Sequence, residues 1–144
     1  MGLQATDILP ISSTGPTVLI PSSKDVVTKV FSVTRSDTTS TLKCVLPADA
    51  SIIEIVKLGN TASDAATTAT VTLVMANNSG TMNTATALDV KGAGTTSAMV
   101  QMPGLPNLQP MPLNGDIRIS ATYAETGTAS TTGGPWYVSV SYVR

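Results

Sequence analysis

The stretch GGPWYVSVSYVR, residues 133–144, decides the fold. Successive side chains of an extended strand point to opposite faces, so its large residues divide into two sets. One face carries Trp136, Val138, Val140 and Tyr142, and the other carries Tyr137, Ser139, Ser141 and Val143. The first set predicts the core-facing side of a closing strand, with its serines toward solvent. Gly133, Gly134 and Pro135 predict the turn that delivers the strand.

A second interpretation of the same aromatic residues is a carbohydrate site. An aromatic ring stacks on the apolar face of a sugar, and Thr or Asn can supply hydrogen bonds. Trp136 and Tyr137 are adjacent, however, and therefore point to opposite sides of a strand. This favours a core or interface role for Trp136. A carbohydrate- or receptor-binding module of a fibre or surface protein is the alternative function.

Most of the remaining chain shows strand patterns separated by turn signals. DIRISATY, for example, places Ile117, Ile119 and Ala121 on one face, and SIIEIVKLG places Ile53, Ile55 and Lys57 together. The predicted strands are 27–33, 41–47, 51–59, 69–76, 85–90, 96–102, 116–123 and 135–143. About eight strands at this spacing, with no sustained helical period, predict an all-β fold. We expect an antiparallel, jelly-roll-like β-sandwich.

Proline marks the expected domain organisation. Residues 1–25 contain Pro10, Pro16 and Pro21 and predict an extended N-terminal arm, whereas residues 26–144 predict a single β-sandwich domain. The apolar segments DIL and TVLI of the arm predict that it docks on a surface, either its own sandwich or a neighbour. A second proline-rich connection follows near residues 103–112, which predicts a rigid, extended loop.

Composition narrows the classes of function. Charged residues make up 12% of the 144 residues, about half the usual share, and the formal net charge is −1. The eight basic residues are scattered, which argues against nucleic-acid binding, since that needs clustered Lys or Arg. No apolar run approaches the roughly 20 residues of a membrane span. Met1 to Ser13 lacks the pattern of a secretory signal, so export by that route is not expected.

The residues of common active sites are missing or scattered. The chain has no histidine, which excludes Ser–His–Asp and Cys–His sites and most zinc sites. We interpret Glu54, Glu125, Asp89 and Asp116 as solvated or turn-capping acids, and no calcium-loop pattern is present. Cys44 is the only cysteine and is predicted to be a small buried hydrophobe. The chain is therefore not expected to be an enzyme, and no cofactor or metal is expected.

Two short motifs match modification patterns. MGLQAT fits the myristoylation form through Gly2 and Thr6, but no basic patch supplies the second anchoring signal. Asn77-Asn78-Ser79 fits a glycosylation sequon, and a turn between strands is the better interpretation.

The order of these features resembles a known family. SIIEIVKLGN, ATVTLVMA, the Gly-rich ALDVKGAG, the Pro-rich connection and the closing TYAETGTASTTGGPWYVSVSYV are similar to small capsid cement, or decoration, proteins of tailed bacteriophages. The likeness covers roughly residues 26–144. It implies a jelly-roll-like sandwich on the outer surface of an icosahedral head, made in the host bacterial cytoplasm. It also implies a homodimer that bridges neighbouring major capsid subunits.

The apolar residues of the arm and of the Pro-rich loop are the predicted contacts with the capsid or with a second copy. These are Ile8, Leu9, Ile11, Val18, Leu19, Ile20, Leu105, Leu108 and Met111. Docking on the protein's own sandwich is the alternative role for these residues.

Overall fold

The described part of the chain is built entirely from strands. The computed structural model describes residues 25–92, 94–100 and 114–144, and these contain no helix. The strands are β1 (Val27–Val33), β2 (Thr41–Leu46), β3 (Ser51–Leu58), β4 (Thr68–Asn77), β5 (Gly80–Asp89), β6 (Ala98–Met99), β7 (Ile117–Thr126) and β8 (Trp136–Val143). The all-β prediction is confirmed. No helix in the described ranges is long and apolar enough to cross a membrane.

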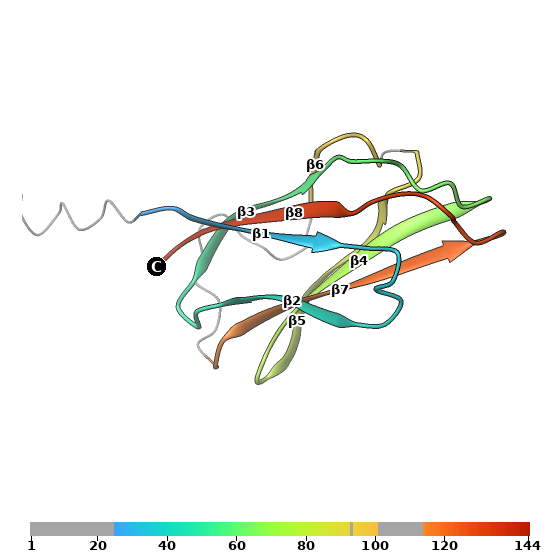
Figure 1. The fold of residues 1–144 in the computed structure, drawn as a ribbon. Helices are drawn as coiled ribbons and strands as arrows, with labels where there is room; N and C mark the ends of the chain where they lie inside the picture. Colours follow the sequence, from blue (N-terminus) through green and yellow to red (C-terminus); the bar gives the residue numbers. More distant parts are fainter. Residues whose placement is uncertain (1–24, 93, 101–113) are drawn as a thin grey trace, which may run out of the picture.

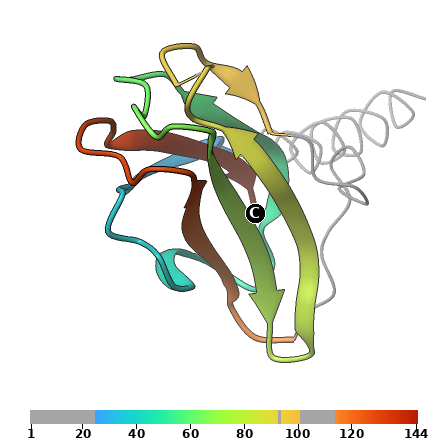
Figure 2. The same ribbon diagram turned by 90° about the vertical axis from the view of Figure 1, so that its right-hand side faces the viewer.

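The strands form two antiparallel four-stranded sheets that pack face to face (Figures 1 and 2). One sheet has the order β1-β8-β3-β6, which we call the β8 sheet, and the other has the order β2-β7-β4-β5, the β7 sheet. Strand β1 pairs with β8, β2 with β7, β3 with β6, and β4 with β5. This nested pairing of first with last is the arrangement of a jelly roll, so the predicted sandwich topology is confirmed.

The core lies between the two sheets. Trp136, Val138, Val140 and Tyr142 of β8 are all buried, as the alternation predicted. The Trp136 ring stacks on Tyr123 of β7, with ring centroids 5.5 Å apart and planes inclined by 13°. This stacked pair joins the two sheets near the end of the sandwich where β8 begins.

The turn before β8 also agrees with the sequence prediction. Gly133 and Gly134 both have positive φ angles, 127° and 69°. A Cβ at Gly133 would come within 2.7 Å of the Cα of Ser63. Glycine is therefore required here both by the backbone conformation and by close packing against the β3–β4 connection.

The alternation prediction was wrong in the first half of β3. A register shift between Ile52 and Glu54 interrupts the pairing of β3 with β8. The bulge buries both Ile52 and Ile55 and leaves Ile53 exposed, instead of placing Ile53 beside Ile55. An extra residue in one strand breaks the alternation, so the side chains before it point to the face opposite to the one predicted.

Two strand lengths also differ from prediction. Strand β5 begins at Gly80, well before the predicted residue 85, because Asn78 and Ser79 alone form the turn between paired Asn77 and Gly80. Strand β6 is limited to Ala98 and Met99 within the described residues, and the predicted Gln101 and Met102 lie outside them.

The two ends of the sandwich differ in what they carry. At the arm end, β1 and β7 begin and β8 ends, beside the short turns 47–50 and 78–79 (Figure 1). At the loop end lie the connections 34–40, 59–67, 90–97 and 127–135. Residue 93, within the third of these, is not among the described residues.

Candidate interaction surface

The nine predicted contact residues, Ile8, Leu9, Ile11, Val18, Leu19, Ile20, Leu105, Leu108 and Met111, lie outside the described residues. The structure does show where each of these two segments joins the following strand. Asp25 leads directly into β1, and Asn114 leads into β7. Both strands begin at the arm end, and Asn114 is fixed there by its carbonyl oxygen, which accepts a hydrogen bond from the Asn78 amide at 3.0 Å. Both segments with predicted contacts therefore enter the sandwich at one end.

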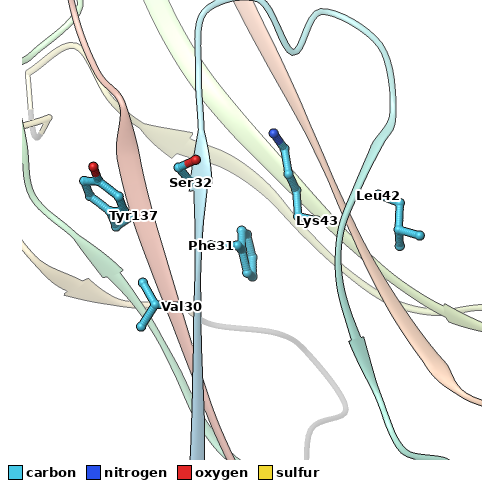
Figure 3. Close-up of a pocket in the computed structure, with 6 residues that line it drawn as sticks. All are labelled: Val30, Phe31, Ser32, Leu42, Lys43 and Tyr137. Atoms are coloured by element: carbon cyan, nitrogen blue, oxygen red, sulfur yellow. The ribbon is translucent and has the colours of Figure 1, made fainter.

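Strand β1 is an edge strand of the β8 sheet. It pairs with β8 over seven consecutive residues, and no strand in the described ranges pairs with its other side. A shallow hollow of about 410 Å³ lies along this edge and is lined by Val30, Phe31, Ser32, Leu42, Lys43 and Tyr137. In Figure 3, Val30, Ser32 and Tyr137 lie on one side of β1, and Phe31 and Lys43 lie on the other. The hollow therefore borders the unpaired backbone of β1 on both of its faces.

The outer face of the β8 sheet is apolar and rich in hydroxyl groups. Strand register places Val30 opposite Ser139, Ser139 opposite Val56, and Val56 opposite Met99, in one row across the sheet. Val30 and Met99 are each 57% exposed, and Tyr137 beside this row is 40% exposed. Glu54 is the one charged residue that the strand register places on this face in the described part of the chain.

Two lysines near the β1 edge, Lys29 and Lys43, are engaged within the protein. The Lys29 ammonium donates a hydrogen bond to the Val45 carbonyl oxygen of β2 at 2.7 Å. Lys43 forms an ion pair with Asp37 at 2.7 Å. Burial raises the pKa of Asp37, but hydrogen bonds from Lys43 and Thr34 and the charge of Lys43 outweigh it and leave the pKa below its usual range. The edge therefore offers backbone groups and apolar side chains rather than unpaired charge.

The loop end is a hydrogen-bonded polar cluster centred on Tyr123. The Tyr123 hydroxyl donates to a Glu125 carboxylate oxygen at 2.6 Å and lies 2.9 Å from the Ser63 hydroxyl and 3.2 Å from the Ser130 hydroxyl. The same Glu125 oxygen accepts the Ser130 amide at 3.1 Å, and Arg35 donates to the Ser130 carbonyl oxygen at 2.7 Å. Three separate connections are joined in this way.

A second carboxylate fixes the same group of loops. Asp64 accepts hydrogen bonds from the backbone amides of Thr131 and Thr132 and from the Thr131 hydroxyl, at 2.7–2.9 Å. Hydrogen bonds from Thr132 and Thr131 lower the pKa of Asp64 to about 2. Hydrogen bonds from Ser130 and Tyr123 likewise lower the pKa of Glu125. Both groups are held as carboxylates by these hydrogen bonds, which is a structural role.

The other predicted acids follow the sequence interpretation. One Asp89 oxygen accepts the amides of Lys91 and Gly92 at 2.8 and 3.2 Å and so caps a turn. Asp89 and Lys91 also line a second hollow, of about 450 Å³, beside the start of β4. Glu54 and Asp116 are exposed. The described ranges contain no group of three or more His, Cys, Asp or Glu side chains that could hold a metal ion.

Cys44 is buried, as predicted, in the inner face of β2. Burial raises the pKa of its thiol, although the charge of Lys29 partly opposes the shift. The thiolate, which is the reactive form, is therefore disfavoured at neutral pH.

Lys57 is a buried residue to which the sequence interpretation gave no role. Its side chain lies on the inner face of β3, and its ammonium donates to the Thr96 carbonyl oxygen at 2.8 Å. Burial lowers the pKa of Lys57, and the charge of Asp89 opposes that shift. Its position two residues after Ile55 is the sequence signal that could have identified it, because residues at this spacing share a face.

Comparison with protein-family models, with curated proteins and with solved structures gave no match.

Proposed function

We propose that this chain is a structural virion protein: a capsid cement, or decoration, protein that binds the outer surface of an icosahedral phage head. It clamps neighbouring major capsid subunits without covalent bonds, associates with a second copy of itself, and needs no cofactor. The host bacterial cytoplasm is where it is made. The resemblance of residues 26–144 to cement proteins supports this proposal, and the jelly-roll sandwich is the fold that the resemblance implies.

One observation carries most of the proposal. The segment before Asp25 and the segment before Asn114 both join the sandwich at the arm end. These two segments contain all nine predicted contact residues. Two apolar segments that join the sandwich at one end can contact two different surfaces of a lattice. Each contact then remains weak, while many symmetric copies add to a stable shell.

The hydrogen-bonded loop end supports the same arrangement. Its polar groups bond to one another, as in the cluster of Tyr123, Glu125 and Ser130. We expect a sandwich closed by such loops to be rigid, which a clamp between subunits requires. We therefore expect the capsid contacts to lie on the two apolar segments and not on the hydrogen-bonded loops.

The experiment that tests this function uses phage heads assembled from the cognate major capsid protein. The full chain is expected to co-sediment with the heads and to raise their resistance to heat. Deletion of residues 1–25 is expected to leave a folded domain, because β1 begins at Val27, and to abolish co-sedimentation. Far-UV circular dichroism and thermal unfolding of the truncated chain provide the folding control.

Two outcomes contradict different parts of the proposal. If the full chain does not bind heads, the cement function is wrong. If the truncated chain decorates heads as well as the full chain, the assignment of the arm as a capsid contact is wrong. A combined Leu105→Ser and Leu108→Ser variant then tests the Pro-rich loop separately.

The buried position of Trp136 argues against the carbohydrate alternative. Trp136 is 1% exposed and packs against Tyr123, so its ring is not available to a sugar. Tyr137 is exposed on the opposite face, without a second aromatic residue beside it in the strand register.

A further inference from the structure

The free edge of β1 differs from the other sheet edges of the described sandwich. Strand β6 has only two residues, and the pairing of β2 with β7 contains a register shift between Leu42 and Cys44. The pairing of β5 with β4 contains two such shifts. Bulges and short strands are devices that prevent edge-to-edge pairing. Strand β1 runs for seven residues with no register shift, so its edge is open to another strand.

The side chains along this edge also permit pairing. Val26 is 60% exposed, and Val27 and Val30 are exposed as well. A projecting lysine commonly blocks an edge, but the Lys29 ammonium is bonded to the Val45 carbonyl oxygen across the opening of the sandwich. Within Val27–Val33 the edge therefore presents β-branched residues that favour a strand, and its one charged side chain, Lys29, is bonded within the protein.

We propose that the occupant of this edge is β1 of a second copy, paired antiparallel about a two-fold axis at Val30. The inference deepens the self-association within the proposed function, but it does not require capsid binding. The two β8 sheets would join into one continuous eight-stranded sheet, twice the four strands of one copy.

The sequence of β1 is complementary to itself in this register. Val30 lies opposite Val30 of the second copy, Thr28 opposite Ser32, and Val27 opposite Val33. On the outer face this gives a valine pair flanked by hydroxyl pairs, and both are favourable cross-strand neighbours. All seven residues of the strand are paired.

Charge selects this register over its neighbours. With the axis at Val30, each Lys29 lies opposite a Phe31 ring, and the two lysines are not opposite each other. With the axis at Lys29, the two lysine positions would be directly opposite each other, and like charges in such a pair are destabilising. With the axis at Phe31, Thr28 of each copy would fall opposite Thr34, beyond the end of the strand, and the valine pair would be lost. A shift by a single residue would place inward side chains opposite outward ones.

The length of chain before β1 bears on the size of this interface. Stable interfaces bury about 800 Å² on each partner, more than one short strand edge supplies. In the proposed register, Val27 lies beside Val33 of the partner. The point where residues 1–24 join the sandwich is therefore next to the partner's loop end. The apolar segments within those residues can then add area on the second copy.

Cysteine cross-linking tests the register directly. Val30→Cys places two thiols opposite each other at the two-fold axis, with Cα atoms about 4.5–5.5 Å apart, within the span of a disulfide. Mild oxidation of the purified full chain should give a disulfide-linked dimer on a non-reducing gel, with a yield about tenfold above that of the unsubstituted chain. The unsubstituted chain gives the background from Cys44, which is buried.

Val27→Cys is the matched control, because it is exposed on the same edge. Its two copies would lie six residues apart along the paired strands, about 20 Å, and should not cross-link to each other. Thr28→Cys and Ser32→Cys should cross-link when mixed but not when oxidised alone.

A charged variant tests the association without any thiol chemistry. Val30→Lys would oppose two ammonium groups at the axis and is expected to weaken dimerisation at least about tenfold, as measured by light scattering or sedimentation. Because Val30 is 57% exposed, the variant should keep the circular dichroism spectrum of the original chain.

Three results would overturn the inference. The full chain could be a monomer in solution, Val30→Lys could leave the mass of the dimer unchanged, or Val27→Cys could cross-link as well as Val30→Cys. None of these results affects co-sedimentation of the full chain with heads, so failure of this interface is distinguishable from failure of the cement function.

Discussion

The two ends of the sandwich differ in how their polar side chains are bonded. At the loop end, Tyr123, Glu125 and Asp64 join the connections to one another through hydrogen bonds. At the arm end, the ion pair of Arg144 with Asp49, 3.0 Å, lies on exposed side chains. A buried or multiply bonded polar group stabilises a fold more than an exposed ion pair does.

This difference assigns the stability of the fold to one end of the sandwich and association with other molecules to the other end and the β1 edge. The loop end fixes the arrangement of the two sheets, because the Trp136–Tyr123 stack lies directly beneath its loops. The arm end and the β1 edge leave apolar side chains and backbone groups exposed. We therefore expect substitutions at the loop end to change unfolding, and substitutions at the β1 edge and the arm end to change association.

Replacement of Trp136 should have the largest effect on stability. Trp136→Ala removes a side chain that is 1% exposed and leaves a cavity against Tyr123, which typically costs about 3–5 kcal/mol. Urea unfolding followed by circular dichroism measures this loss. The indole Nε1 has no hydrogen-bond partner within the described residues, so Trp136→Phe keeps the stacked ring without losing a hydrogen bond. It should be clearly less damaging than Trp136→Ala.

Tyr137→Ala is the matched control for that experiment. It removes the neighbouring aromatic side chain, which is 40% exposed on the outer face of the same strand. The expected loss is below about 1 kcal/mol, since exposed positions tolerate substitution. Equal losses at the two positions would contradict the assignment of the β8 faces.

Loss of one hydroxyl group should have the next largest effect. Tyr123→Phe keeps the stacked ring but removes the group that bonds Glu125 and lies beside Ser63 and Ser130. Leaving such partners unsatisfied costs about 1–3 kcal/mol in unfolding free energy. The same truncation at an exposed position, Tyr137→Phe, should change stability little. If Tyr123→Phe were neutral, the loop end would not be the stabilising end.

The sequence predicted the parts of the fold that depend on alternation. In β7 and β8 the inward residues, such as Ile117, Ile119 and Trp136, were identified correctly because one face is buried along the whole strand. The bulge in β3 could not be predicted, because Ile52, Ile53 and Ile55 are equally apolar and no local residue marks the inserted position. The length of β5 depended on the tightness of the turn after Asn77, which the polar sequence NNSG did not reveal.

The sequence likewise identified some of the candidate surfaces and missed others. Apolar residues among prolines identified the arm and the Pro-rich loop as contact segments, and those predictions fall outside the described residues. The β1 edge was not identified from the sequence, because whether a strand is central or at an edge depends on pairing between distant strands. Val27 and Tyr142, for example, are paired across nearly the whole chain. The Tyr123 cluster was missed for the same reason, since its partners come from separate loops.

The smallest expected effect is the pH dependence that Asp64 gives to the loop end. Its pKa is about 2 in the folded chain, below the value near 3.9 of an unfolded aspartate, so the folded state favours the carboxylate. Asp64 therefore stabilises the fold fully above about pH 4, and this contribution is lost as the pH falls toward 2. Asp64→Ala should lower the urea midpoint at pH 7, and the difference from the original chain should shrink between about pH 4 and pH 2. Asp49→Ala at the arm end, which breaks an exposed ion pair, is the control and should change the midpoint little at pH 7. A difference for Asp64→Ala that stays constant down to pH 2 would mean that the carboxylate charge does not hold Thr131 and Thr132 in place.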